Sequence, residues 1–564
     1  MNKTFSKIVV SIFLLIPVAI FFIAWDFYAI NIPKWDDHSL KAFIVDMSNA
    51  NSWTAQFAAL SKQHNEHRIA LTRLIAWLDF KWTGALNYRH LMMAGNLLLL
   101  AALPLFHSLL HQNKKPLFAL VPIPFLWLTL AFWENMYWGM AAIQNFGVVT
   151  LVLWTIYLCI HPSNTLFVIS LLLACLTVVT SGNGLFVLPI GAVLLFIGRK
   201  PQRLGLWVLV SAGALYGYFN WYQGNVSNPE SRASFFQLLK GYMAFLGSFA
   251  ESVPVPNSFQ ICIIAGTLLF LVSVSIGINA LYRLSSQKKV QESEKITDLF
   301  TIGALMFILG TALIVVYSRA GFGLEGLITS RYKIYSVLLL VIAYLYIVVP
   351  IRGSFLSPYI SAITLLAVIF NIFSYYYHLV DASNLRKMLS TDQFNWTYTD
   401  KSLTIAPDST FAQGIVAKTP NNYKLWFGSI KLADKQGYAG VTQGLSALMG
   451  QTELKETPTN MLVSNNHYTS QRLIDSGVYL LFSNQERYYV YPTYRTRNRN
   501  RKQLFLKQLY FAPGFYSDVP FSQMKAGTYK VGILRQEGGK LGILFKSKQI
   551  IIPEVKANKI EVNW

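Results

Sequence analysis

The chain has 564 residues, of which 53% are hydrophobic, 15% are aromatic and only 13% are charged. An ordinary soluble domain carries about 25% charged residues, so this composition excludes a typical soluble protein and indicates a membrane protein. Apolar stretches of about 20 residues, the length that crosses a bilayer, recur as far as residue 379 and then stop. We therefore predict a membrane region over residues 1–379 and one further domain over residues 380–564.

The net charge of +22 is shared equally by the two parts, because each contains 24 Lys and Arg and 13 Asp and Glu, giving +11 each. In the first part, the excess fits the positive-inside rule. In the second part, it suits a domain that lies against anionic head groups or glycan phosphates. Nucleic acid is the weaker interpretation, and we predict no nucleic-acid partner. The three cysteines all lie in apolar stretches, which excludes a disulfide framework.

Eleven stretches are apolar enough for membrane spans. The first, residues 8–30, follows Lys3 and Lys7 as a secretory signal would. It is longer than the about 7–15 apolar residues of a signal peptide and lacks a cleavage site, so we predict an uncleaved helix. The other ten stretches are 91–110, 117–133, 146–160, 166–180, 185–197, 204–221, 259–281, 299–317, 334–349 and 360–378.

An odd number of spans places the two chain ends on opposite sides of the membrane. With the N-terminus in the cytoplasm, most basic clusters fall in short cytoplasmic loops, as the positive-inside rule requires. These clusters are Lys114 and Lys115; Arg199, Lys200 and Arg203; Arg283, Lys288 and Lys289; and Arg352. The first outer loop is also rich in cations, which fits the rule less well. We predict a multi-pass protein of the bacterial inner (cytoplasmic) membrane whose C-terminal domain is periplasmic or extracellular.

Two outer loops, 32–90 and 222–258, are long enough to hold interfacial helices. Apolar residues recur in them at spacings of three and four, the helical period, so short helices with apolar faces toward the lipid are expected. After residue 379, β-rich stretches alternate with Gly, Asn and Pro, a pattern typical of strands and turns. The predicted fold class is therefore mainly α, a polytopic membrane protein with about 11 transmembrane helices, followed by a β-sandwich-like exoplasmic domain.

Polar side chains at the ends of spans are candidate functional residues, since they are costly at membrane depth. In this sequence they concentrate on the predicted outer side, and the cytoplasmic loops offer no comparable set. They are Asp36 and Asp37; His64, Glu66, His67 and Arg68; Glu134, Asn135, Trp138 and Gln144; Asn183; and Arg319, Arg331 and Tyr332. A reaction is therefore expected at the outer leaflet of the membrane.

The chemistry that this set suits is transfer of a sugar from a lipid phosphate. The phosphate leaves as a stable anion, so it needs cationic ligands, and one carboxylate is enough to take the proton of the acceptor. Two carboxyl groups flanking the bond would instead indicate a hydrolase. We predict Asp36 or Asp37 as the base and Arg319 and Arg331 as phosphate ligands.

The other candidates are expected to bind the substrate. The rings of Trp138 and Tyr332 could stack on a sugar or on the first isoprene units. Glu134 borders a continuous apolar stretch, where a carboxylate without a role costs about 2.5–3.5 kcal/mol if buried. No cofactor is required for this chemistry.

The predicted architecture resembles the GT-C class of membrane glycosyltransferases. The shared features are the acid pair after the first span, the helices of the first outer loop, about eleven spans and the C-terminal β-rich domain. The stretches NEHR (65–68), WENMYWG (133–139), SGNG (181–184) and SRY (330–332) are similar to patterns in bacterial members from surface-polysaccharide loci. The resemblance implies an inverting enzyme with a polyprenyl-phosphate sugar donor, a glycan or lipid acceptor, and the acid of the first loop as base. Two adjacent acids leave the base ambiguous, and the absence of a WWD-type motif argues against a metal-dependent variant.

Simpler roles are open for several of these residues. Asp36 and Asp37 would also suit the N-terminus of a helix that starts near Ser39. Arg319 and Arg331 would also suit the membrane interface, with their guanidinium groups extended to lipid phosphates.

The cluster of His64, Glu66 and His67 has a spacing that a metal site permits, but no third ligand is evident. We predict no metal site, and a divalent metal is the alternative. A polar face, or residues that order the pocket, is the preferred interpretation.

The stretch 495–502 contains five cations in eight residues. In a strand, Arg495, Arg497, Arg499 and Arg501 would share one face. Contact with a polyanion or lipid surface and a plain solvated loop are both open.

Two further functions are open for the whole chain. A transporter or flippase for lipid-linked glycans would need polar groups across both leaflets, and the inner halves of the spans are almost free of charge. A polysaccharide polymerase or ligase would use similar chemistry with a diphosphate-linked donor.

Overall fold

The computed structural model describes residues 3–223, 233–253, 257–286, 291–399, 444–469, 476–537 and 540–554. The chain divides into two compact units. Unit 1 comprises Met1–Trp25, Ala50–Trp77 and His90–His378. Unit 2 comprises Asp26–Asn49, Leu78–Arg89 and Leu379–Trp564, so it includes two segments of the first predicted outer loop.

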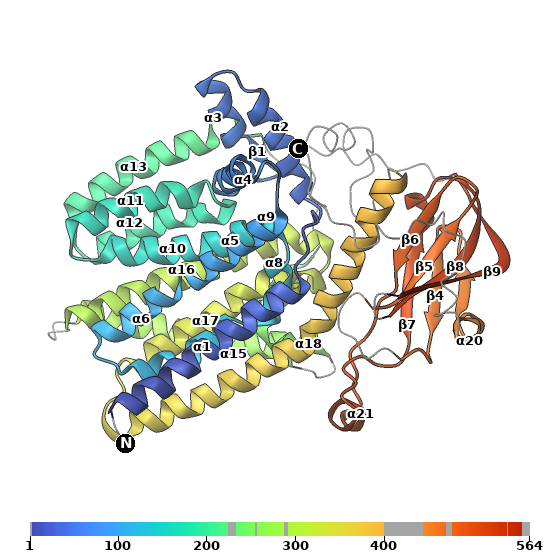
Figure 1. Ribbon diagram of the computed structural model, residues 1–564. Coiled ribbons are helices and arrows are strands. Elements are labelled where there is room, and N and C mark those ends of the chain that lie inside the picture. The colour runs from blue at the N-terminus through green and yellow to red at the C-terminus, as the bar shows by residue number, and fades with distance from the viewer. Residues whose placement is uncertain are drawn as a thin grey trace. The chain divides into compact units, whose positions relative to one another are not determined.

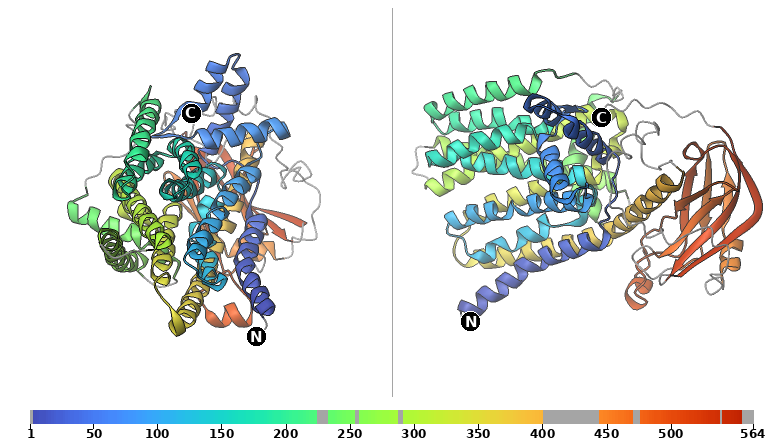
Figure 2. Two further views of the ribbon diagram at one scale, coloured as in Figure 1. Left: turned by 90° about the vertical axis from the view of Figure 1, so that its left-hand side faces the viewer. Right: turned by 45° about the horizontal axis from the view of Figure 1, so that its top comes forward.

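The long helices of unit 1 run side by side in all the views (Figures 1 and 2). Four of the helices, α1, α4, α5 and α18, continue into segments of unit 2. In chain order the helices are α1 (Lys3–Tyr28), α3 (Trp53–Ser61), α4 (Ala70–Thr83), α5 (Tyr88–Leu100), α6 (Leu103–Gln112), α7 (Pro122–Trp127), α8 (Trp133–Met136), α9 (Gly139–Ala141), α10 (Gly147–Ile160), α11 (Asn164–Val178), α12 (Val187–Ile197), α13 (Pro201–Phe219), α14 (Phe235–Leu246), α15 (Ser258–Ser285), α16 (Glu292–Arg319), α17 (Lys333–Val348) and α18 (Leu356–Thr399).

Within the described part of the chain, eight helical segments are long and apolar enough to cross a membrane. They are Lys7–Tyr28, Tyr88–Gln112, Leu117–Met136, Gly139–Ile160, Ser258–Ser285, Glu292–Phe322, Ser330–Val348 and Gly353–Asn395. The protein is therefore a mainly helical, multi-pass membrane protein. The other three predicted spans coincide with α11, with the apolar helix Gly182–Ile197 and with α13, of which the first two are shorter than the eight.

The helices expected in the two outer loops are present. The first loop contains α2 (Asp37–Asn49), α3 and α4, and the second contains α14. Ser234 and Gln237 form a capping box at the start of α14, which satisfies the first amides of that helix. Residues 224–232 and 254–256 of the second loop lie outside the described residues.

Glycine lets α14 and α15 approach each other closely. A Cβ atom added at Gly247 would lie 2.0 Å from the carbonyl oxygen of Cys262, and one added at Gly266 would lie 1.7 Å from that of Met243. Small residues allow such close contact between helices in a membrane, where packing rather than the hydrophobic effect drives helix association.

The described residues of unit 2 form two antiparallel sheets (Figure 1). The three-stranded sheet has the order β3-β4-β7, and the four-stranded sheet has the order β6-β5-β8-β9. The strands are β3 (Glu453–Glu456), β4 (Asn460–Asn465), β5 (Gly477–Ser483), β6 (Tyr488–Pro492), β7 (Phe515–Pro520), β8 (Gly527–Glu537) and β9 (Lys540–Ile552).

Side chains from both sheets and from helix α20 (Leu445–Gly450) form one hydrophobic core. Met461 and Val519 come from the smaller sheet, and Leu480 and Ile533 come from the larger one. The other face of the larger sheet is covered by Phe394 near the end of α18. Burial on both faces explains why β5 is an almost continuous apolar strand instead of an alternating one.

Candidate functional site

Polar residues from four separate stretches of unit 1 lie in a connected cluster. The Arg319 guanidinium forms an ion pair with Glu66 at 2.9 Å. The main-chain N–H of Gly182 donates to Nδ1 of His67 at 3.2 Å, and the next residue, Asn183, donates to the hydroxyl of Tyr335 at 2.7 Å. The structure thus brings together stretches that the sequence analysis selected separately.

A short hairpin positions the His64–Arg68 stretch. Its strands, β1 (Gln63–His64) and β2 (His67–Arg68), pair in antiparallel register around Asn65, whose φ of 49° is left-handed. Asn is one of the few residues other than glycine that adopts this conformation readily. The turn places the side chains of Glu66 and His67 beside Arg319 and Gly182.

His67 is held as a neutral imidazole. Burial lowers its pKa, and the nearby Glu66 carboxylate only partly offsets this effect. Because Gly182 donates to Nδ1, that nitrogen is unprotonated and the ring proton lies on Nε2. A Cβ atom at position 182 would lie 2.5 Å from Nδ1, so the contact requires glycine.

Arg68 has a structural role in the hairpin. Its Nε donates to the carbonyl oxygen of Tyr218 at 2.6 Å, and its two terminal nitrogens donate to those of Ser61 and Asn220. These bonds hold the hairpin to the end of α13. The predicted substrate contact of Arg68 stays a prediction, and the arrangement of its donors gives it no support.

Arg331 lies in an aromatic and acidic setting. Its Nε is 3.4 Å from a carboxylate oxygen of Glu134, and its guanidinium carbon lies 5.5 Å from the ring centre of Trp138 and 6.0 Å from that of Tyr332. Its side chain is 35% exposed. Among the described residues, neither terminal nitrogen of Arg331 has a hydrogen-bond partner, so both can receive a ligand.

The main chain around Arg331 and Glu134 is held in register by three polar contacts. The hydroxyl of Ser330 accepts from the N–H of Glu134 at 3.0 Å, and the amide of Asn135 donates to the carbonyl oxygen of Arg331 at 3.0 Å. Asn145 in turn donates to Asn135 at 2.8 Å. These bonds join α8 to the turn η8 (Ser330–Tyr332) and fix both partners of the ion pair.

Gln144 and Asn183 also point toward polar partners. Gln144 lies in η3 (Ala142–Phe146), a single π-helical turn, a feature often found at functional sites. Its amide donates to the hydroxyl of Ser181 at 3.3 Å. The predicted Gln144 and Asn183 therefore belong to the same connected cluster.

Sequence analysis missed a further ion pair in unit 1, between Lys333 and Glu251. Lys333 is almost fully buried and is paired with Glu251. Nε2 of His378 lies 3.4 Å from Nζ of Lys333 and 3.4 Å from the hydroxyl of Ser252. All of these residues lie near ends of predicted spans, so the rule that selected Arg331 could have selected them.

The two predicted base residues belong to unit 2. Asp37 is the first residue of α2 and is buried, and its carboxylate accepts from the main-chain N–H of Lys34 at 3.0 Å. Asp36 is partly exposed, and its carbonyl oxygen accepts from Ser39. Asp37 therefore occupies the helix-start position that was the simpler interpretation of the pair, and Asp36 is the more accessible acid.

Asp37 also affects a buried lysine in α2. Burial lowers the pKa of Lys41 from 10.5 to about 7, and the Asp37 carboxylate opposes that shift. Burial also lowers the pKa of His38, with the nearby Lys41 as a second cause.

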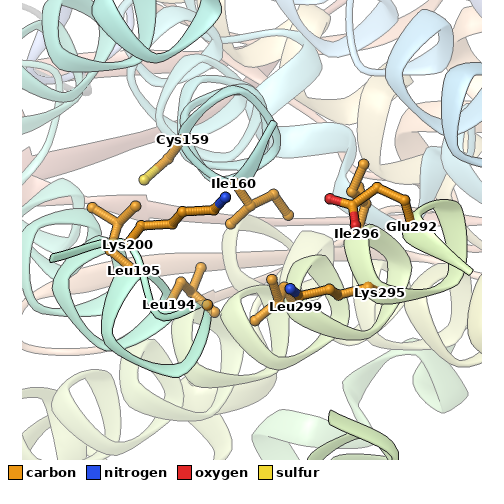
Figure 3. A pocket seen from close by; sticks show the side chains of 10 residues that line it. Cys159, Ile160, Leu194, Leu195, Lys200, Glu292, Lys295, Ile296 and Leu299 are labelled. Atoms are coloured by element: carbon orange, nitrogen blue, oxygen red, sulfur yellow. The ribbon is translucent and has the colours of Figure 1, made fainter. Parts of the chain in front are cut away.

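The loops with the predicted cytoplasmic cations meet elsewhere in unit 1. Lys115 donates to the carbonyl oxygen of Ile351 at 2.6 Å, and Glu294 pairs with both Arg283 and Arg352. A cavity of about 350 Å³, including its part open to solvent, lies between α10, α12 and α16 (Figure 3). It is lined by apolar side chains together with Lys200, Glu292 and Lys295 and contains none of the predicted site residues.

In the part of the chain that the structure describes, no three His, Cys, Asp or Glu side chains are grouped so that they could hold a metal ion. No family model, no curated protein and no solved structure matches the chain.

Proposed function

We propose that the protein is an inverting glycosyltransferase of the GT-C type, which moves a sugar from a polyprenyl-phosphate donor to a surface glycan or lipid acceptor. The observation that carries the proposal is the setting of Arg331. The Nε of Arg331 lies 3.4 Å from a Glu134 carboxylate oxygen, and its two terminal nitrogens have no hydrogen-bond partners among the described residues. A guanidinium in this state can bind two oxygens of one phosphate.

The rings beside Arg331 suit the rest of such a donor. Tyr332 is partly exposed and offers a face that can lie against a sugar or the first isoprene units, whereas the Trp138 ring is buried beside the Arg331 guanidinium. A phosphate alone would need only cations, so the aromatic rings favour a ligand that is both anionic and apolar. The second pair, Arg319 with Glu66, belongs to the same polar cluster and supplies another cation.

In the proposed reaction, a hydroxyl oxygen of the acceptor attacks the anomeric carbon as the bond between that carbon and the phosphate oxygen breaks. The polyprenyl phosphate leaves with the bonding electrons, and Arg331 stabilises the growing negative charge. A carboxylate takes the proton of the acceptor hydroxyl. The family resemblance assigns this base to the acid pair, Asp36 or Asp37.

The proposal also includes three membrane spans in addition to the eight candidate spans. Helices α11, α12 and α13 would cross the membrane with the other eight, giving eleven spans with a cytoplasmic N-terminus. The polar cluster and the two sheets of unit 2, packed as a β-sandwich, would lie outside the cytoplasmic membrane of a bacterium. The basic loops around Lys115 and Arg352 would then lie in the cytoplasm, as the positive-inside rule expects.

The experiment measures sugar transfer in membranes that contain the full-length chain. A panel of radiolabelled polyprenyl-phosphate sugars is supplied, and label is followed into lipid and polymer fractions. We expect Arg331→Gln to lower kcat/KM by about 10²–10³ fold, the usual effect of removing one charge-stabilising donor. Arg331→Lys should recover only part of this loss, since an ammonium lacks the paired donors. One of the two substitutions Asp36→Asn and Asp37→Asn should abolish transfer.

The matched control is Arg352→Gln, an exposed arginine that also pairs with a glutamate. This variant should transfer normally. Full activity in Arg331→Gln, or in both Asp36→Asn and the double variant with Asp37→Asn, would contradict the proposal. Activity only with diphosphate donors would indicate a polymerase or ligase, and donor movement into proteoliposomes without transfer would indicate a transporter.

A further inference from the structure

The basic stretch of unit 2 forms a projecting loop that ends in the short helix α21 (Arg501–Leu506) (Figure 1). The two sides of the loop pair with each other. The N–H of Ala512 donates to the carbonyl oxygen of Thr496 at 2.9 Å, and the N–H of Asn498 donates to that of Tyr510 at 2.7 Å. The helix is therefore held at the end of a paired base.

Two asparagines fix the shape of the tip. The Asn500 side chain accepts from the N–H of Gln503 and caps α21. The buried Asn498 side chain donates to Gln503 and to the carbonyl oxygen of Leu509, at 3.0 and 3.1 Å. These hydrogen bonds give the tip a defined conformation and a defined set of outward-facing side chains.

The structure divides the cations of this stretch into two kinds. Arg495 is buried, lies 3.7 Å from the ring centre of Phe511 and donates to Ser383. The expectation that Arg495, Arg497, Arg499 and Arg501 share one strand face is therefore wrong, because a helix begins at Arg501. The exposed cations of the tip are Arg499, Arg501, Lys502 and Lys507.

The tip also exposes two large apolar side chains. Phe505 is 76% exposed and Leu506 is 80% exposed, and no residue of α21 is buried. Residues 495–508 contain no acidic residue. Adjacent apolar side chains accompanied by several cations and no acid are the combination that enters the interface of an anionic bilayer, where the acyl chains receive the apolar groups and phosphates face the cations.

We propose that the tip, residues 499–507, is a membrane-docking element that inserts Phe505 and Leu506 among the head groups of anionic lipids. Helix α18 joins a candidate membrane span to unit 2 without a break, so the chain tethers this unit to the membrane. A protein partner would more commonly meet a mixture of both charges, whereas four cations without an acid match a uniformly anionic surface. The inference concerns lipid binding and does not depend on the proposed transferase activity.

The test measures amide hydrogen exchange in the full-length chain by mass spectrometry. The chain is placed in nanodiscs with phosphatidylglycerol, in nanodiscs of phosphatidylcholine alone, and in neutral detergent, and the detergent rate of each variant is its own reference. We expect exchange over residues 501–508 to slow by about tenfold or more in the anionic discs and by less in the zwitterionic discs, since each cation near an anionic surface strengthens binding about fivefold.

Two variants separate the contributions. Phe505→Ser with Leu506→Ser should remove the slowing in both kinds of disc, and Arg501→Gln with Lys502→Gln should remove the difference between the discs. The matched control is Ile551→Ser, which changes an apolar side chain of β9 that is 75% exposed and should leave the slowing intact.

Three results would overturn the proposal. The first is equal exchange over residues 501–508 in anionic discs and detergent, and the second is the same slowing in the Phe505 and Leu506 double variant. The third is slowing that follows protein concentration instead of lipid, which would assign the tip to a contact with a second copy of the chain.

Discussion

The ion pair between Lys333 and Glu251 allows the energetics of unit 1 to be tested directly. The Lys333 side chain is 1% exposed and that of Glu251 is 23% exposed. Removing one member of a fully buried pair costs about 3–5 kcal/mol, because the other charge is left uncompensated. Since Glu251 is partly exposed and His378 lies 3.4 Å from Nζ of Lys333, we expect Glu251→Gln to lower the free energy of unfolding by a smaller amount, about 2–3 kcal/mol.

The reverse substitution should cost less. Lys333→Met keeps an unbranched side chain, and the Glu251 carboxylate that it leaves behind can be hydrated, so we expect a loss of about 1 kcal/mol. The double variant contains no uncompensated charge and should be about as stable as Lys333→Met alone, which corresponds to a coupling energy of about 2–3 kcal/mol.

The assay is unfolding of the purified full-length chain in mixed micelles of dodecyl maltoside and SDS, followed by tryptophan fluorescence. Arg352→Gln is the control, because it removes a salt bridge whose arginine is 59% exposed, and it should change stability by less than about 0.5 kcal/mol. Additive effects of the two single substitutions would refute the reasoning, as would a larger loss for Lys333→Met than for Glu251→Gln.

Three further predictions concern other parts of the chain. Gly182→Ala should displace His67 and lower transfer activity, because the new Cβ would lie 2.5 Å from Nδ1 of His67. The control Gly205→Ala should leave transfer activity unchanged, because a Cβ at that position meets nothing within 4 Å. Burial lowers the pKa of Lys41 from 10.5 to about 7, so between these pH values the unfolded chain binds more protons than the folded chain and stability should rise with pH. Melting curves at pH 7 and 9 should show a larger rise in melting temperature for the native chain than for Lys41→Met. Equal rises would contradict the lowered Lys41 pKa. Asn500→Ala removes the cap of α21 and should destabilise that helix by about 1 kcal/mol. In detergent, amide hydrogen exchange should become faster over residues 501–506 only, and unchanged exchange over these residues would show that the cap does not stabilise the helix.

The sequence was sufficient to locate the helices of unit 1, because long apolar stretches reveal membrane helices without tertiary information. Each of the eleven predicted stretches coincides with a helical segment. What the pattern could not reveal was the division into units. Segments 26–49 and 78–89 group with the C-terminal residues, and such grouping depends on long-range contacts that leave no periodic signal.

The basic stretch of unit 2 shows the same limit at short range. The alternating arginines would share one face in a strand, but the local hydrogen bonds of Asn498 and Asn500 favour a capped helix. Arg495 is buried because Phe511, sixteen positions later, provides a ring for it. Sequence spacing describes which side chains could share a face, and only the partners decide which of them do.

The arginines of the candidate site show why a cation in a motif is not by itself a ligand-binding group. The sequence analysis predicted Arg68 as a substrate contact and Arg331 as a phosphate ligand. Arg68 has all of its guanidinium nitrogens bonded to main-chain carbonyl groups, whereas Arg331 uses Nε for Glu134 and, among the described residues, leaves its terminal nitrogens for a ligand. Substitution of either should lower activity, but for different reasons: Arg68→Gln should lower stability and activity together, and Arg331→Gln should lower activity alone. Unfolding curves measured beside transfer rates therefore distinguish them, and a loss of stability in Arg331→Gln as large as in Arg68→Gln would remove the basis for assigning the phosphate to Arg331.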